Sequence, residues 1–221
     1  MQRAVIRYAV FVVSLICIVE SVWCDEPTIE EVASFPKQQV TGVAVAGDGR
    51  LFVNFPFWSD DHTVSVAELM KDGTLKPFPN EEWNRTEGAP DKRWVCVQSV
   101  FVDDNDVLWV LDPASPKMEG VIKGGPKLVK IDLSTNEVVQ TISFEDSLAP
   151  QNSYLNDVRV DTRTGHAFIS ESGTGALLVV DLNSGTKRRL LAEHSSTKAE
   201  QGVELKVDGI KLIDPNTGKT P

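Results

Sequence analysis

Three stretches of this chain repeat one pattern, a pair of short apolar strands separated by a tight polar turn. In the clearest copy, residues 95–112, the acidic turn 103–106 separates two strands whose apolar residues alternate. The pattern recurs on both sides, since Val43 lies 57 residues before Val100 and Val158 lies 58 residues after it. An aromatic residue occupies the same place in the second strand of each copy: Phe52, Trp109 and Phe168.

Each copy is followed by two further strand patterns, which divides the chain into units of four strands. The units lie at about residues 41–78, 95–142 and 155–191. Short strands repeated at a near-fixed period are the signature of a β-propeller, whose blades have four strands each. The alternative is a β-sandwich with three unrelated hairpins, because hairpins share their turn chemistry in any all-β fold. We expect an all-β propeller array of about three blades within residues 25–221.

Residues 1–24 have the layout of a secretory signal peptide. Arg3 and Arg7 form a basic start, an apolar run covers residues 8–19, and Cys24 closes the cleavage region. The apolar run of twelve residues is shorter than the roughly 20 that a membrane-spanning helix needs. We therefore expect a secreted protein, extracellular or periplasmic if its host is a bacterium, and no membrane partner.

The charge balance excludes one large class of partners. The chain carries a formal net charge of −10, and nucleic acids and anionic membranes both require basic surfaces. After removal of the signal peptide, Cys96 is the remaining cysteine. Its place between two valines on a strand predicts a buried small side chain in preference to a nucleophile.

The candidate ligand site comes from the geometry of a propeller. The first strand of each blade lines the central channel, and the loops entering those strands form one mouth. Small polar ligands could bind there, or a hard cation such as Ca²⁺ through the oxygens of Asn156 and Asp157. The alternative is that these two side chains cap the start of their strand by bonding the backbone. The polar residues expected at the mouth are Thr41, Gln98, Ser99, Asn156 and Asp157.

Patterns of enzyme chemistry are weak, and no catalytic residue is assigned. The sequence contains no Gly-x-Ser-x-Gly elbow, and its three histidines have no metal-ligand spacing. Asn84 begins a glycosylation sequon, Asn-Arg-Thr, on the polar connection 79–93. Trp58, after the second strand of the first unit, either walls a pocket or belongs to the core.

Several of these segments together resemble the yellow/major royal jelly protein family, in particular its microbial members related to dopachrome tautomerase. The resemblance covers nearly all of residues 25–221. It implies a secreted six-bladed propeller that is distantly similar to gluconolactonase- and regucalcin-like propellers. The segments that carry it are 40–45, 49–54, 108–112 (Leu-Trp-Val-Leu-Asp), 125–133, 154–161 and 169–177.

This chain departs from the insect members of that family in two local features. Asp112-Pro113-Ala114 stands where insect members tend to have Asp-Thr-Gly, and Asn105 stands where a partner for Cys96 is expected. Two functions follow from the resemblance. The leading one is a non-catalytic propeller that binds a small molecule or an extracellular partner. The alternative is a divalent-metal-dependent lactonase- or tautomerase-like enzyme with Asn156 and Asp157 at its centre.

Length sets a further expectation. About half of the family's length is missing, and a fourth unit, expected to open near residue 216, is not found there. We expect a fragment corresponding to the N-terminal half of a propeller, with the apolar lateral faces of its first and last blades exposed. Missing blades or a second copy would be needed to close the ring.

Overall fold

The computed structural model describes residues 29–200, 202–213 and 218. The expected signal peptide, residues 1–24, lies outside this described part. The chain forms two compact units, Met1–Val32 and Ala33–Pro221, and the account below concerns the second unit. Within the described residues, no helix has the length and apolar character required to cross a membrane.

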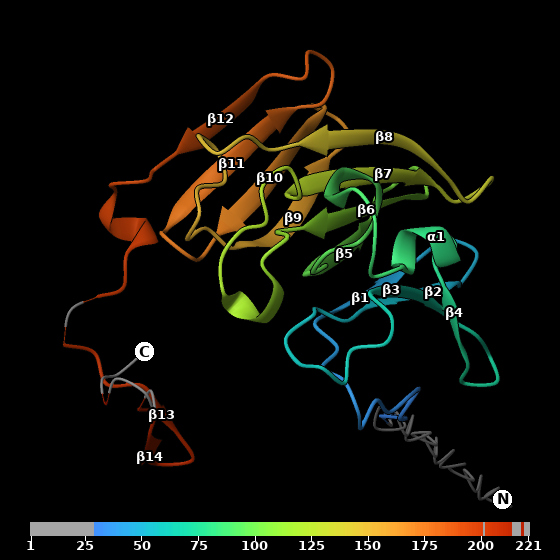
Figure 1. The fold of residues 1–221 in the computed structure, drawn as a ribbon, viewed down its shortest axis with the longest axis horizontal. Coiled ribbons are helices and arrows are strands. Elements are labelled where there is room, and N and C mark those ends of the chain that lie inside the picture. The colour runs from blue at the N-terminus through green and yellow to red at the C-terminus, as the bar shows by residue number, and fades with distance from the viewer. Residues whose placement is uncertain (1–28, 201, 214–217, 219–221) are drawn as a thin grey trace, which may run out of the picture. The chain divides into compact units, whose positions relative to one another are not determined.

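Three antiparallel sheets of four strands follow one another along the chain (Figure 1). In each sheet the strands are hydrogen-bonded in sequence order, so every connection is a hairpin-type reversal. We call the sheets blade 1, blade 2 and blade 3. Blade 1 contains β1 (Gly42–Val45), β2 (Leu51–Asn54), β3 (Val66–Leu69) and β4 (Leu75–Pro77). Blade 2 contains β5 (Ser99–Val102), β6 (Val107–Asp112), β7 (Lys127–Asp132) and β8 (Glu137–Ser143). Blade 3 contains β9 (Leu155–Asp161), β10 (His166–Glu171), β11 (Ala176–Asp181) and β12 (Lys187–Leu190).

The turn between the first two strands of each blade explains why the strands reverse where they do. Gly49, Asp106 and Gly165 end these turns with φ of 86°, 54° and 67°. Left-handed backbone of this kind suits glycine and is tolerated by aspartate. The acidic turn of blade 2 is also fixed by its own side chain, because Asp103 Oδ1 accepts from the backbone N–H of Asn105 at 2.9 Å.

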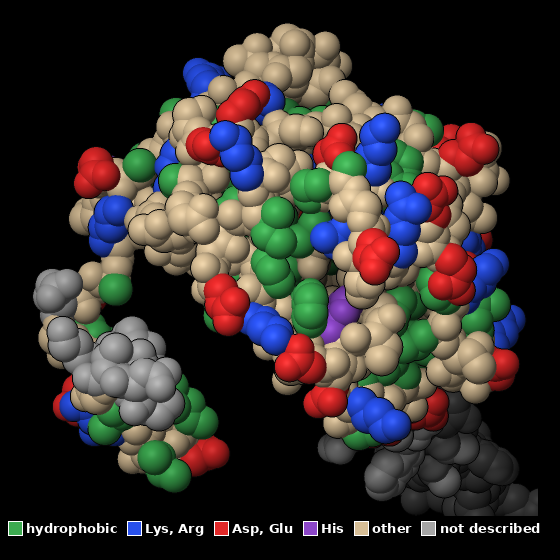
Figure 2. Space-filling view, in the orientation of Figure 1, with side chains coloured by type: hydrophobic (Ala, Val, Ile, Leu, Met, Phe, Trp, Pro, Cys, Tyr) green, Lys and Arg blue, Asp and Glu red, His purple; other side chains and the backbone are tan. Residues whose placement is uncertain are grey.

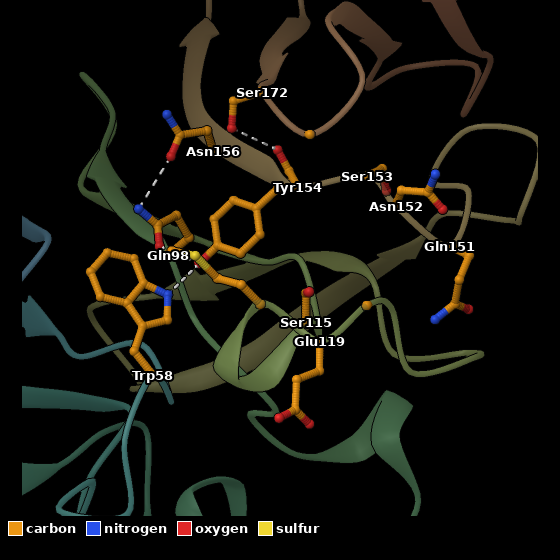
Figure 3. A pocket seen from close by; sticks show the side chains of 13 residues that line it. Trp58, Gln98, Ser115, Glu119, Gln151, Asn152, Ser153, Tyr154, Asn156 and Ser172 are labelled. Carbon is orange, nitrogen blue, oxygen red and sulfur yellow. Dashed lines mark hydrogen bonds between the residues drawn. The ribbon is translucent and has the colours of Figure 1, made fainter. Parts of the chain in front are cut away.

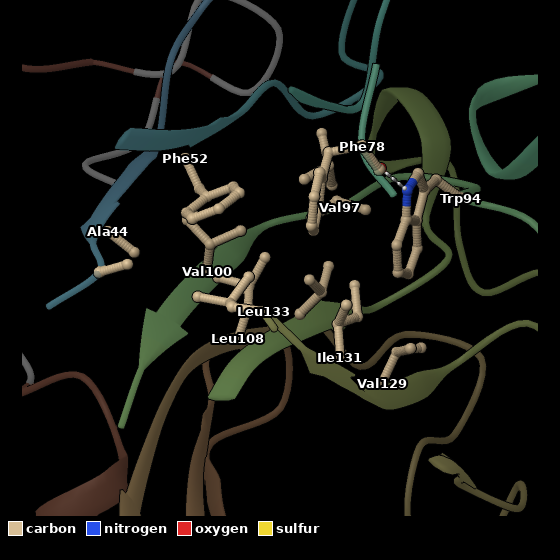
Figure 4. Close-up of a cluster of buried hydrophobic side chains, with 13 residues drawn as sticks. Ala44, Phe52, Phe78, Trp94, Val97, Val100, Leu108, Val129, Ile131 and Leu133 are labelled. Atoms are coloured by element: carbon tan, nitrogen blue, oxygen red, sulfur yellow. Dashed lines mark hydrogen bonds between the residues drawn. The ribbon is translucent and has the colours of Figure 1, made fainter. Parts of the chain in front are cut away.

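The blades pack face to face through two apolar clusters. One cluster joins Ala44, Phe52 and Val66 of blade 1 to Val100 and Leu108 of blade 2 (Figure 4). All five side chains are buried, and full burial of a residue such as Phe52 stabilises the fold by about 1.5–3 kcal/mol. Alternation along each strand sends the neighbouring side chains to the opposite face.

The second cluster joins blade 2 to blade 3. Trp109 and Leu111, which alternate with the residues facing blade 1, contact Val158, Ala167 and Ile169 of blade 3. The fold is therefore a β-propeller array of three four-stranded blades, as the repeated sequence pattern predicts. The β-sandwich alternative is wrong, because the three sheets stack in series.

Short helices and one further hairpin complete the described part. The polar connection after blade 1 contains α1 (Glu81–Asn84), whose first turn is capped by Asn80 Oδ1 accepting from the N–H of Trp83 at 3.0 Å. The further hairpin consists of β13 (Lys206–Val207) and β14 (Ile210–Lys211). The 3-10 helices are Pro90–Lys92, Pro116–Met118 and Ser195–Thr197.

Charged side chains of both signs are interspersed over the molecular surface. Figure 2 shows them scattered around hydrophobic side chains that gather near the middle of the visible face. The visible face has no extended basic patch of the kind that binds nucleic acid.

Candidate functional site

The segments that enter the first strands of the three blades lie next to one another, as expected for one mouth. Thr41 Oγ1 donates to the backbone oxygen of Gln98 at 2.9 Å, and Gln98 Nε2 donates to Asn156 Oδ1 at 3.2 Å. Hydrogen bonds therefore run from blade 1 to blade 2 to blade 3 in order. Of the five residues expected at the mouth, Gln98 and Asn156 line a pocket, which is described next.

Thr41, Ser99 and Asp157 lie outside the lining of that pocket. Ser99 is buried, and its Oγ donates to Asp157 Oδ1 at 2.9 Å. The backbone N–H of Asp157 donates to Ser170 Oγ at 3.1 Å. The contacts of Ser99 and Asp157 thus join blade 2 to blade 3 and fix the start of β9.

The pocket has a volume of about 640 Å³ and is open to solvent at the mouth (Figure 3). Its walls come from all three blades and from two long connections between second and third strands. Such connections lie at the same end of an antiparallel sheet as the loops entering its first strand. The side chains most important to its chemistry are Trp58, Gln98, Glu119, Ser153, Tyr154 and Asn156.

A hydrogen-bonded network fixes one wall of the pocket. Trp58 Nε1 donates to Tyr154 Oη at 2.8 Å, and Tyr154 Oη donates in turn to Gln98 Oε1 at 2.8 Å (Figure 3). Together with the bond from Gln98 to Asn156, this network links side chains of all three blades. Burial raises the pKa of the Tyr154 hydroxyl, so the phenol is neutral at physiological pH. The wall is uncharged and held in one arrangement.

Ser153 differs from its neighbours because its hydroxyl is unsatisfied. The residue is 2% exposed and lines the pocket, yet its Oγ has no hydrogen-bond partner within the described part of the chain. A buried hydroxyl without a partner costs about 1–3 kcal/mol. Such a group in a pocket wall is suited to bond a polar atom of a bound molecule.

A buried carboxylate supports the loop that carries Tyr154. Glu171 Oε1 accepts from the backbone N–H of Tyr154 at 2.9 Å and from that of Gly173 at 2.7 Å. Glu171 Oε2 accepts from Arg189 at 2.6 Å and from the Thr174 hydroxyl at 2.7 Å. Burial alone would raise the pKa of Glu171, but the hydrogen bonds from Thr174, Tyr154 and Arg189 lower it below its ordinary value.

A second buried carboxylate supports the long connection after β6, which carries Ser115 and Glu119 of the pocket lining. Asp112 and Lys127 form an ion pair of 2.7 Å in which both side chains are fully buried. Asp112 also accepts from the backbone N–H groups of Val95, Cys96 and Ala114 at 2.7, 3.0 and 2.9 Å. It therefore anchors both the segment that enters blade 2 and the long connection after β6.

Cys96, whose backbone N–H donates to Asp112, is inert. It is fully buried, as the sequence predicts. Burial, with a smaller contribution from the nearby Asp112 carboxylate, raises the pKa of its thiol to about 12. The thiol therefore stays protonated at physiological pH and is not a nucleophile.

The calcium site expected at Asn156 and Asp157 stays a prediction. Each of these side chains already accepts a hydrogen bond, from Gln98 and Ser99 respectively. Among the residues that the structure describes, no group of three or more His, Cys, Asp or Glu side chains could hold a metal ion.

The sequon residue Asn84 lies at the end of α1, and its amide is fully engaged. Its Oδ1 accepts from the N–H groups of Ser65 and Val66 at 2.9 and 3.1 Å. Its Nδ2 donates to the carbonyl oxygens of Phe78 and Asn80, both at 3.1 Å. In the folded chain this nitrogen holds the edge of blade 1 against α1.

Comparison with known proteins gives one family and several partial likenesses. The family model described as Major royal jelly protein matches residues 95–212. The dopaminechrome tautomerase of Drosophila melanogaster is 27% identical over 157 residues, which cover 65% of this chain and 34% of that protein. The chain thus spans about a third of the length of this curated relative.

Partial likenesses to solved structures cover most of this chain and less than half of each matched structure. An auxiliary nutrient binding protein from Bacteroides ovatus has a TM-score of 0.49 and 12% identity, covering 82% of this chain and 38% of its own. A protein of unknown function from Bacteroides caccae has a TM-score of 0.43 and 12% identity, covering 71% of this chain and 47% of its own.

Proposed function

Since this chain belongs to the major royal jelly protein family, we propose that it is a secreted propeller protein that binds a small polar molecule in the pocket at the mouth. The apolar run near its N-terminus supports secretion. The observation that carries the binding proposal is the unpartnered, buried hydroxyl of Ser153 beside a wall of fixed side chains.

The chemistry of the lining favours a neutral or cationic ligand. Among the described lining residues Glu119 is the one with a formal charge, and the others are amides, hydroxyls, aromatic rings, glycines and the thioether of Met118. Anionic ligands would meet no basic side chain there. Trp58 and Tyr154 offer apolar surface, while the Ser153 hydroxyl and the amide nitrogen of Asn156 offer polar contacts.

The condition of Tyr154 and Cys96 supports binding without catalysis. The Tyr154 hydroxyl already accepts one hydrogen bond and donates another. The Cys96 thiol is buried and protonated, with its pKa raised to about 12. Neither group is free to act as a base or a nucleophile at neutral pH.

The experiment is a thermal-shift screen of amines, polyols, lactones and catechols, followed by calorimetry on the best compound. Ser153→Ala should weaken binding about fivefold, which corresponds to the loss of a hydrogen bond of about 1 kcal/mol. Ser184→Ala, which removes a hydroxyl from an exposed turn, serves as the matched control and should bind as the wild type does. Equal affinity of the two serine variants would refute the role of this pocket.

A tautomerase is the second candidate, supported by the likeness to the dopaminechrome tautomerase of Drosophila and by Glu119. A tautomerase moves a proton between two sites of its substrate, and a carboxylate at the pocket can carry that proton. Absorbance at the dopaminechrome band would follow turnover, with and without Ca²⁺ to include the metal-dependent alternative. Conversion that exceeds the uncatalysed rate and disappears in Glu119→Gln would support this candidate. Conversion equal to the uncatalysed rate would refute it and favour the binding function.

A further inference from the structure

A second, smaller pocket lies beside the end of α1. Its volume is about 70 Å³, against about 640 Å³ for the pocket at the mouth, and the two pockets share no lining residue. A water molecule in the liquid occupies about 30 Å³, so this space holds about two waters or one small ion. The side chains of its lining that matter for binding are His62, Ser65, Arg85, Thr86, Arg93 and Trp94.

The charge of this pocket is positive. Arg85 and Arg93 line it, and none of its described lining residues is an aspartate or a glutamate. The chain as a whole has the opposite balance, with a formal net charge of −10. Burial lowers the pKa of His62, so its imidazole is neutral at physiological pH. The two guanidinium groups therefore give the pocket its charge.

Both guanidinium groups meet at Gly88. Arg93 Nε donates to the backbone oxygen of Gly88 at 3.2 Å. The guanidinium of Arg85 packs against the same residue, because a Cβ atom on Gly88 would lie 3.1 Å from Arg85 Nη2 and 3.2 Å from Arg85 Nε. Two like charges that contact one residue repel each other. An anion bound between them would relieve this repulsion.

Neither arginine is well neutralised by a carboxylate of the fold. Arg93 forms no ion pair in the described part of the chain. Its Nη1 donates to the backbone oxygen of Trp94 at 3.0 Å, while its Nη2 has no acceptor among the described residues. Arg85 pairs with Glu82 at 3.5 Å, but these side chains are 48% and 70% exposed, and such surface pairs contribute little. The Thr86 hydroxyl adds a neutral donor to the lining.

We propose that this pocket binds a small oxoanion, phosphate or sulfate, between the guanidinium groups of Arg85 and Arg93. The planar fork of a guanidinium matches two oxygen atoms of such an ion. Ser65 and Trp94 of the lining are both 2% exposed, so part of the wall is withdrawn from water, where hydrogen bonds to a charge are stronger. The volume accepts an oxoanion with one central atom, either free or as the terminal group of a larger molecule. This site is independent of the ligand proposed for the mouth.

Tryptophan fluorescence of the full chain, titrated with sodium phosphate and separately with sodium sulfate, tests the site, because Trp94 forms part of the pocket wall. Sodium chloride holds the ionic strength constant. Arg93→Gln should weaken binding about tenfold or more, as expected for the loss of hydrogen bonds to a charged group. Arg188→Gln is the matched control, since it removes the same charge from an exposed position on β12, and it should bind as the wild type does.

Arg85→Gln keeps the test decisive if Arg93→Gln does not fold. The Arg85 side chain is 48% exposed, so its replacement should leave the circular dichroism spectrum unchanged. It should nevertheless weaken binding about tenfold, because it removes one of the two guanidinium groups. A fluorescence change that does not saturate in the wild type, or that has the same midpoint in Arg85→Gln and Arg188→Gln, would overturn the proposal.

Two further measurements identify the source of the anion and separate this site from the mouth. Methyl phosphate that binds as tightly as inorganic phosphate would support the terminal group of a larger molecule, and weaker binding would support the free ion. Ser153→Ala, which alters the mouth pocket, should leave the phosphate titration unchanged. A loss of phosphate binding in Ser153→Ala would place the anion at the mouth and refute the site at Arg85 and Arg93.

Discussion

Lys127→Met should destabilise the chain severely, because it leaves the Asp112 carboxylate buried without its cation. Both partners of the ion pair are 0% exposed, and the distance between Nζ and Oδ2 is 2.7 Å. Lys127 also donates to the carbonyl oxygens of Pro90 and Gly125 at 2.9 and 3.1 Å. The substitution keeps the volume of the side chain but removes all three donors.

The magnitude follows from the burial of the pair. Breaking a buried ion pair by removal of one partner costs about 3–5 kcal/mol, chiefly because the remaining charge is uncompensated. With a urea m-value of about 2 kcal/mol per M, the midpoint of unfolding should fall by about 1.5–2.5 M. Asp112→Asn combined with Lys127→Met should recover at least about 1 kcal/mol, since the double variant buries no charge.

Urea unfolding followed by circular dichroism measures these changes. Arg163→Met is the matched control, because it removes the cation of an exposed pair with Asp161 at 3.4 Å, and it should leave the midpoint unchanged. A loss below about 1 kcal/mol in Lys127→Met, or a double variant less stable than the single one, would refute the reasoning from buried charge.

Three further predictions concern titration and the sequon. Because the pKa of Glu171 is lowered on folding, its ionised carboxylate stabilises the fold above the ordinary pKa of 4.5, and this contribution is lost as the pH falls through the lowered value. Acid unfolding should therefore show a loss of stability that is absent in Glu171→Gln. Identical acid unfolding curves for the two proteins would contradict this prediction. The pKa of the Cys96 thiol is raised from 9.0 to about 12, so its contribution to stability is fully present below pH 9 and is lost as the pH rises toward 12. In Cys96→Ala the free energy of unfolding should therefore fall less steeply at alkaline pH. Rapid thiol labelling of the native chain at pH 8 would contradict the burial. Asn84→Ala should cost about 2 kcal/mol or more of stability because it leaves two backbone N–H groups without an acceptor. Thr86→Ala, which also removes the sequon, should cost little. The intact mass of the chain from a glycosylating host should show no glycan on Asn84, and a stable glycoform would contradict this prediction.

The repeated strands could be read from the sequence because their cause is local. Alternating apolar residues and turns at Gly49, Asp106 and Gly165 determine where each strand begins and ends. The aromatic residues Phe52 and Trp109 then mark the faces that the next blade covers.

Half of the site could not be found in this way. Gln98 and Asn156 follow from their place at the start of first strands, and Trp58 takes the pocket-wall position, one of the two alternatives that the sequence leaves open. Glu119 lies on a long connection whose path depends on tertiary contacts. A signal was nevertheless present, because the connections 55–65 and 113–126 are much longer than a hairpin turn and belong to the same end of their sheets. The unsatisfied hydroxyl of Ser153 can be recognised only from coordinates, since no pattern of neighbours in the sequence distinguishes this serine from the others.

A crystal structure of the chain soaked with the best compound from the ligand screen tests the central claim most directly. The account predicts that the compound lies in the pocket of about 640 Å³ beside Trp58 and Tyr154, with a polar atom within hydrogen-bonding distance of Ser153 Oγ. A bound compound elsewhere on the molecule, or one that fills the pocket and leaves Ser153 without a partner, would contradict it.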